Sequence, residues 1–121
     1  MPHQRQRLGQ LAEDAACLFL EEQGFTIVQR NYRTRAAEID IIAKDGDTLV
    51  FVEVKARSTL SKGGPREAVG TAKQQKIILG ARHFLSENRL ADVRVRFDVV
   101  ALYEKNNRFK IELIENAFQA E

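Results

Sequence analysis

Two runs of alternating apolar and polar residues, joined at Asp45-Gly46, constrain the fold of this chain most. The runs cover residues 37–44 and 48–56. An Asp-Gly pair between such runs is a strong signal for a two-residue β-hairpin turn, because both residues tolerate a positive φ. Side chains alternate along a strand with period two, so the sequence predicts a hairpin with one polar and one apolar face.

The polar face of this hairpin gathers charged residues. A turn at Asp45-Gly46 pairs Asp40 with Phe51 and Glu38 with Glu53, so Asp40 and Glu53 are diagonal neighbours. Lys55 lies on the same face, two residues beyond Glu53. A register change of one residue would separate Asp40 from Glu53. The apolar face is expected to be core and consists of Ile39, Ile41, Val50, Val52 and Val54.

Carboxylates beside a lysine suit the hydrolysis of phosphodiesters. Mg²⁺ prefers hard oxygen ligands and keeps several waters, so two or three carboxylates suffice to hold it. We expect Asp40 and Glu53 to be direct ligands of Mg²⁺ or Mn²⁺, together with the backbone carbonyl of Val54. Lys55 is expected to orient the attacking water or to stabilise charge on the phosphate.

Two further glutamates are candidates for an outer ligand or a second metal position. Glu38 shares the polar face of the hairpin. Glu13 lies at the edge of the apolar face of a helix predicted over residues 8–23, from which it can reach a sheet that the helix covers. The alternative for Glu13 is an ordinary surface carboxylate. The alternative for Glu38 is an exposed cross-strand ion pair with Lys55, which contributes little to stability.

A basic segment follows the hairpin. Between residues 54 and 86, seven basic residues stand against the single acid Glu67. This excess favours a polyanionic partner, namely nucleic acid, over the alternative of a solvated surface. The residues expected to hold phosphates are Arg57, Lys62, Arg66, Lys73 and Lys76.

The predicted element order is one helix, three strands, a second helix and two more strands. A length of 121 residues with 44% apolar residues suits one domain over 8–121, after a flexible start at residues 1–7. The first three strands are expected to form an antiparallel meander, and a right-handed crossover brings the fourth strand in parallel to the third. The fold class is therefore α/β with a mixed sheet. The predicted ranges are 8–23, 25–33, 37–44, 48–56, 66–88, 93–103 and 109–114.

Several classes of protein are disfavoured by composition. Cys17 is the only cysteine and lies in an apolar helical pattern, so we expect a buried thiol rather than a disulfide or zinc ligand. No apolar run reaches membrane-spanning length, and the N-terminus lacks the apolar core of a signal peptide. The expected location is the cytoplasm.

A family resemblance rests on motifs spread over the chain. The sequence resembles the PD-(D/E)xK nuclease superfamily and, more closely, the bacterial YraN-like family of uncharacterised, endonuclease-like proteins. It departs from the superfamily motif at Ile39, where the motif has proline. The residues that carry the resemblance are Gly9 with Glu13, Asn31-Tyr32-Arg33, Glu38-Ile39-Asp40, Glu53-Val54-Lys55-Ala56-Arg57, Ala68-Val69, Lys73-Gln74 and Arg96-Phe97-Asp98-Val99-Val100.

The resemblance implies a restriction-endonuclease-like fold and a Mg²⁺-dependent nuclease that acts on structured or branched DNA. Archaeal Holliday-junction resolvases have a related fold, act as homodimers and use a helix glutamate, a role that Glu13 matches. By the same resemblance, Lys73 and Gln74 contact phosphate or the attacking water. A non-catalytic nucleic-acid-binding module and an assembly module remain alternatives. A homodimer and a protein partner that supplies specificity are further expectations.

Overall fold

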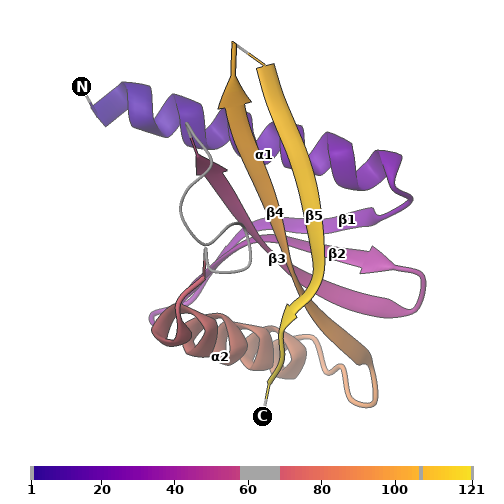
Figure 1. The fold of residues 1–121 in the computed structure, drawn as a ribbon. Helices are drawn as coiled ribbons and strands as arrows, with labels where there is room; N and C mark the ends of the chain where they lie inside the picture. The colour runs from indigo at the N-terminus through magenta and orange to yellow at the C-terminus, as the bar shows by residue number, and fades with distance from the viewer. Residues whose placement is uncertain (1, 58–68, 107, 121) are drawn as a thin grey trace.

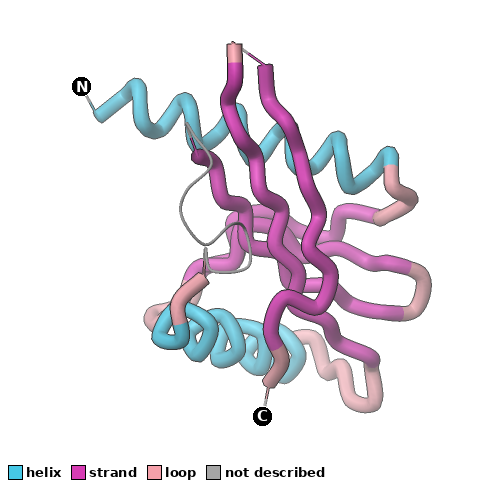
Figure 2. Tube along the Cα trace, in the orientation of Figure 1, coloured by secondary structure: helices cyan, strands magenta, loops and turns pink. Residues whose placement is uncertain are grey.

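The computed structural model describes residues 2–57, 69–106 and 108–120 and contains two helices and five strands (Figures 1 and 2). The five strands form one mixed sheet in the order β1-β2-β3-β4-β5, in which only β3 and β4 are parallel. This confirms the predicted α/β class, the antiparallel meander and the parallel fourth strand. The elements are α1 (Pro2–Glu22), β1 (Thr26–Arg33), β2 (Glu38–Asp45), β3 (Thr48–Arg57), α2 (Thr71–Glu87), β4 (Arg94–Lys105) and β5 (Arg108–Phe118).

Each face of the sheet is covered by one helix, which gives two hydrophobic cores (Figure 1). The core under α1 contains Val50 and Val52, as the hairpin pattern predicts. The opposite face carries Glu53, yet it is also core along most of its length, because Leu49 and Phe51 are buried beneath α2. Burial of a side chain such as Phe51 stabilises the fold by about 1.5–3 kcal/mol. The predicted polar face is therefore polar only near the end of the strands.

Both helices begin at positions that the apolar pattern does not mark. Helix α1 starts at Pro2, not Leu8. The apolar pattern does not extend to residues 3–7 because they are polar. Proline fits the first turn of a helix. The expected flexibility of residues 1–7 stays a prediction. Helix α2 starts at Thr71, not residue 66, because Gly70 is extended at its N-cap (φ −71°, ψ 163°).

The hairpin turn is Gly46-Asp47, so the predicted Asp45-Gly46 turn is wrong by one position. Asp45 pairs with Thr48, and Gly46 takes the positive φ of +61° that the first position of such a turn requires. A tertiary contact keeps Asp45 in the strand, because its Oδ2 accepts a hydrogen bond of 3.0 Å from Arg96 Nη1. The register shifts by two residues, and an even shift keeps the side chains of β3 and of β2 from Ile41 to Asp45 on their predicted faces.

The alternation of β2 breaks at Asp40. Ile41 belongs to the core under α1, whereas Ile39, two residues away, belongs to the core under α2. The prediction that both share one face is therefore wrong. Opposite this break, between the pairs Arg30–Ile41 and Tyr32–Ile39, Asn31 has a φ of +53°, which asparagine tolerates better than most residues. The face of the sheet to which the β2 side chains point therefore changes at Asp40.

Candidate metal and nucleic-acid site

Asp40 and Glu53 meet where β2 and β3 separate. The ladder between the two strands ends at the pair Ile41–Val52, and one further step places Asp40 opposite Glu53. The Oδ2 atom of Asp40 accepts a hydrogen bond of 2.8 Å from the backbone N–H of Val54. The aspartate side chain therefore satisfies a backbone donor at the point where the ladder stops, and this bond fixes its direction. The two acids are direct neighbours rather than the predicted diagonal ones.

Burial makes this pair of carboxyls electrostatically unfavourable when both are ionised. The Glu53 side chain is 3% exposed. Burial, followed by a hydrogen bond to Glu53 and by the charge of Glu53, raises the pKa of Asp40 to about 8, against the lowering effect of the Val54 N–H. A low dielectric and a second carboxyl both disfavour the ionised form. A cation or a proton is therefore favoured between the two groups.

Two lysines lie beside the Oε2 atom of Glu53. The Lys73 ammonium, from the first turn of α2, forms an ion pair with Oε2, and Lys55 Nζ lies 4.0 Å from the same atom. Burial lowers the pKa of Lys73, but the ion pair with Glu53 outweighs it and leaves the pKa raised. Oε2 is buried and accepts no well-directed hydrogen bond from the described residues. Glu53 thus has charge compensation but an unused acceptor site.

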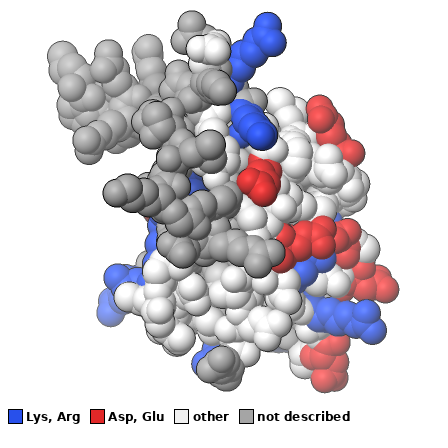
Figure 3. Space-filling view, in the orientation of Figure 1, with Lys and Arg blue, Asp and Glu red and all other residues white. Residues whose placement is uncertain are grey.

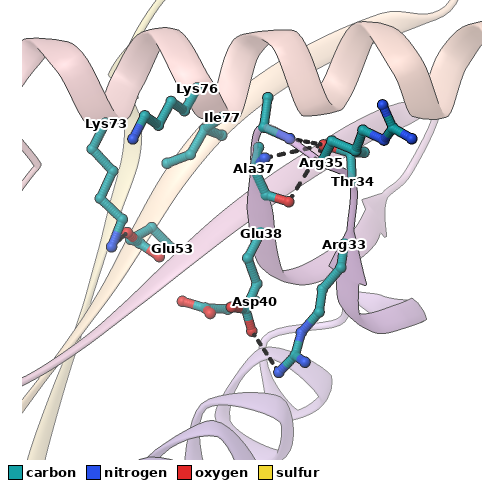
Figure 4. Close-up of a pocket in the computed structure, with 11 residues that line it drawn as sticks. Arg33, Thr34, Arg35, Ala37, Glu38, Asp40, Glu53, Lys73, Lys76 and Ile77 are labelled. Atoms are coloured by element: carbon teal, nitrogen blue, oxygen red, sulfur yellow. Dashed lines mark hydrogen bonds and ion pairs between the residues drawn. The ribbon is translucent and has the colours of Figure 1, made fainter.

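A pocket of about 570 Å³ opens in front of the two acids (Figure 4). Lys73 and Lys76 extend into it from α2 on one side (Figure 4). Arg33, the last residue of β1, and Arg35, in the segment that joins β1 to β2, line it as well. In Figure 3, which has the orientation of Figure 1, several basic side chains appear on the left, where α2 begins, whereas on the right basic side chains are mixed with acidic ones.

Glu13 and Glu38 each lie beside an arginine. Glu38 lines the pocket, but its carboxylate is exposed and lies 3.4 Å from Arg33 Nη2. Glu13 lines a neighbouring pocket that shares Arg33 and Glu38, and its Oε1 lies 3.8 Å from Arg30 Nη2. Burial raises the pKa of Glu13, while Arg30 lowers it. In the described part of the chain, no three Asp, Glu, His or Cys side chains are placed to hold one metal ion, so Glu13 as a ligand stays a prediction.

The predicted phosphate contacts are only partly placed. Lys73 and Lys76 line the pocket. Gln74 instead donates a hydrogen bond of 2.9 Å from Nε2 to the carbonyl of Val69, so it holds the entry to α2. The remaining candidates, Lys62, Arg66 and the side chain of Arg57, lie outside the described residues.

Sequence reasoning did not assign Arg33 and Arg35 to the site. Their segment contains no glycine-rich or lysine-rich signal, and Arg33 belongs only to a motif of the family resemblance. The sequence signal that marks the segment is Thr34, whose hydroxyl can organise a tight turn. The predicted buried thiol of Cys17 is confirmed, since Cys17 is buried in the core under α1.

Fold and site together define an α/β protein with a mixed five-stranded sheet, consistent with a restriction-endonuclease-like fold, and a carboxylate–lysine cluster where its central strands diverge. The chain belongs to the uncharacterised protein family UPF0102, whose model matches residues 12–102. This confirms the predicted YraN-like family. None of the described helices has the length and apolarity needed to cross a membrane.

Curated relatives match over nearly the whole chain. A UPF0102 protein of Desulforapulum autotrophicum is 74% identical over 121 residues and covers both chains completely. A UPF0102 protein of Desulfosudis oleivorans is 52% identical over 99% of this chain and 96% of its own. A third, from Syntrophus aciditrophicus, is 48% identical over 96% of this chain and 91% of its own.

Proposed function

We propose that this protein is a Mg²⁺- or Mn²⁺-dependent nuclease of the PD-(D/E)xK type that hydrolyses phosphodiester bonds in structured or branched DNA. The observation that carries the proposal is the pairing of Asp40 with the buried Glu53 in a pocket that cations line, with Lys73 and Lys55 beside Glu53. Buried carboxyls that perturb each other in a cleft are typical of functional sites.

The residues present fit a divalent cation. The Oε2 atom of Glu53 is buried without a directed hydrogen bond from the described residues, and the Oδ2 atom of the neighbouring Asp40 accepts from the Val54 N–H. Asp40 and Glu53 would hold the ion, which would place positive charge beside the phosphate and acidify a water. The two acids leave the remaining positions to water, as Mg²⁺ prefers.

The lysines have separate roles in this proposal. Lys55, whose Nζ lies 4.0 Å from Glu53 Oε2, would stabilise negative charge that grows on the phosphate. Lys73 is 48% exposed and can exchange its contact with Glu53 for a phosphate oxygen when DNA binds. Such an exchange would remove the ammonium from Glu53 Oε2 and leave this oxygen to the cation.

A cleavage assay tests the proposal. Linear, flapped, single-stranded and four-way-junction DNA would be incubated with Mg²⁺ or Mn²⁺ and the wild type, Asp40→Asn, Glu53→Gln or the control Asp47→Asn. Asp47 is an exposed turn residue of equal charge. We expect cutting that needs metal, falls at least about a hundredfold in the first two variants and persists in the control. Normal cutting by Asp40→Asn would refute the site.

A second candidate is a non-catalytic nucleic-acid-binding module. Two observations favour it: Lys73 already compensates Glu53, and no third acidic side chain among the described residues joins the pair. Binding of DNA by the wild type and by Asp40→Asn with equal affinity, without cutting by either, would support this module instead.

A further inference from the structure

Hydrogen bonds within the segment between β1 and β2 fix its conformation. The Thr34 Oγ1 atom accepts hydrogen bonds from the backbone N–H groups of Ala36 at 3.2 Å and Ala37 at 3.0 Å. The Thr34 N–H also donates to the carbonyl of Ala37 at 2.8 Å. A threonine hydroxyl that accepts from the backbone in this way organises a tight turn. We call residues 33–37 the Thr34 turn.

The Thr34 turn is also packed against α2. A Cβ built on Gly80 would lie 3.2 Å from both Ala37 Cβ and Ile39 Cδ1. The absence of a side chain at Gly80 therefore allows the helix to approach the turn closely. Glycine in a helix interior costs about 0.5–1 kcal/mol relative to alanine, and here it allows this approach. The helix and the turn form two walls of the same pocket.

Each wall presents cations. Lys73 and Lys76 come from α2, and Arg33 and Arg35 come from the Thr34 turn. The Arg33 guanidinium is 72% exposed and contacts only the exposed Glu38 among the described residues. Arg35 is exposed and makes no side-chain hydrogen bond or ion pair to described residues. Figure 4 shows Arg33 on the side of the carboxylates away from the two lysines and Arg35 further out.

We infer that the Thr34 turn is a second phosphate-binding wall, in which Arg33 and Arg35 hold the sugar–phosphate backbone opposite Lys73 and Lys76. This inference rests on the proposed function and adds residues to its binding surface. Arginine is suited to the task because its planar guanidinium can bind two phosphate oxygens and remains charged. The strand would then run between the two walls, with its scissile phosphate above Asp40 and Glu53.

The test measures the binding of fluorescein-labelled single-stranded, duplex and four-way-junction DNA by anisotropy at several salt concentrations. Ca²⁺ would be present to occupy oxygen ligands. The variant is Arg33→Gln/Arg35→Gln, and the matched control is Arg82→Gln/Arg94→Gln. Both control residues are exposed and lie outside the pocket. Each double variant removes two positive charges, so a general electrostatic effect would be equal in both.

We expect the Arg33→Gln/Arg35→Gln variant to lose affinity on the order of tenfold to a hundredfold. The slope of log K against log salt should fall by about 1.4 to 1.8, because each lost phosphate contact removes about 0.7 to 0.9. The control should keep the wild-type slope. Equal salt slopes and equal affinities for the two double variants would overturn the inference. In that case, metal-dependent cutting by the wild type would still support the proposed function. Failure of the wild type both to bind and to cut would refute the two together.

A third variant tests the turn itself without any change in charge. Thr34→Val removes the hydroxyl that accepts from Ala36 and Ala37, and Thr34→Ser keeps it. We expect a several-fold loss of DNA affinity in Thr34→Val and near wild-type affinity in Thr34→Ser. Wild-type affinity in Thr34→Val would exclude a binding wall that depends on this turn.

Discussion

Two buried carboxylates of the sheet, Asp98 and Glu53, differ in their hydrogen-bond partners. Asp98 in β4 is fully buried and accepts hydrogen bonds from Arg96 Nε and Nη2 and from the backbone N–H of Asn116, each at 2.9 Å. Glu53 in the neighbouring strand is 3% exposed, yet its Oε2 accepts no directed hydrogen bond from the described residues. Both acids lie beside cations, but only Asp98 also accepts directed hydrogen bonds on both carboxylate oxygens from the described residues.

The difference separates a structural charge from a candidate functional one. The Asp98 carboxylate raises the pKa of Arg96, whose guanidinium also binds Asp45 and lies 5.6 Å from the centre of the Phe25 ring. That network joins β4 to the β2–β3 hairpin and faces no pocket described above. The Asp40–Glu53 pair opens on a pocket and lacks one partner. A buried polar group without a full set of partners destabilises the fold unless a ligand completes it.

The largest predicted effect is on the satisfied carboxylate. Asp98→Asn should destabilise the protein by about 3–5 kcal/mol, because it leaves the guanidinium of Arg96 with only part of its charge compensation. Urea denaturation at neutral pH measures the loss. A change below about 1 kcal/mol would mean that the network is not the structural element that its geometry indicates.

The same substitution in the Asp40–Glu53 pair, at Asp40, should change stability in the opposite direction. Asp40→Asn keeps an oxygen that can accept from Val54 N–H and removes an acid whose pKa is raised to about 8. We expect the metal-free protein to gain about 1–3 kcal/mol at pH 8, by the same urea measurement. A loss of stability as large as that of Asp98→Asn would remove the contrast between the two regions.

The pH dependence of stability follows from the same group. The pKa of Asp40 rises from 3.8 to about 8 on folding. Between these values the folded state binds more protons than the unfolded state, so metal-free stability should fall as pH rises from about 4 to about 8. Asp40→Asn should flatten this slope, and Mg²⁺ should raise the melting temperature of the wild type more at pH 8 than at pH 6. A Mg²⁺ effect that is equal at both values would contradict binding between the two acids.

Substitution of two helix glycines by alanine tests whether the packing of α2 against the Thr34 turn shapes the site. Gly80→Ala should destabilise the protein by about 1 kcal/mol, because its Cβ would crowd Ala37 and Ile39. Gly9→Ala in α1 meets nothing within 4 Å and should stabilise by about 0.5–1 kcal/mol through helix propensity. Thermal unfolding compares the two. Stabilisation by both changes would show that the Thr34 turn is not held closely by α2.

The smallest effect is expected at the exposed ion pair. The side chains of Arg33 and Glu38 are 72% and 46% exposed and lie 3.4 Å apart, so Arg33→Gln should change stability by less than about 0.5 kcal/mol. A much larger loss in urea denaturation would make Arg33 a structural residue like Arg96, and its role on the Thr34 turn would need revision.

Local patterns were sufficient to predict the element order, the mixed sheet and the shared face of Glu53 and Lys55. Each follows from period-two alternation, turn residues and the rule for parallel connections. The turn position was missed because Arg96, 51 residues away, holds Asp45 in its strand. The proximity of Lys73 to Glu53 was missed for a similar reason, since helix periodicity does not encode which end of a sheet a helix covers.

The sequence by itself determined that acidic residues and a lysine would lie together on the β2–β3 hairpin of an α/β protein. Only the tertiary structure decided that β2 and β3 separate at Asp40, that its carboxylate accepts from Val54 N–H, and that Lys73 and the Thr34 turn adjoin the pair. The physical reason is range. Hairpin geometry depends on a few neighbouring residues, whereas the burial that perturbs Asp40 arises from the packing of elements far apart in the chain.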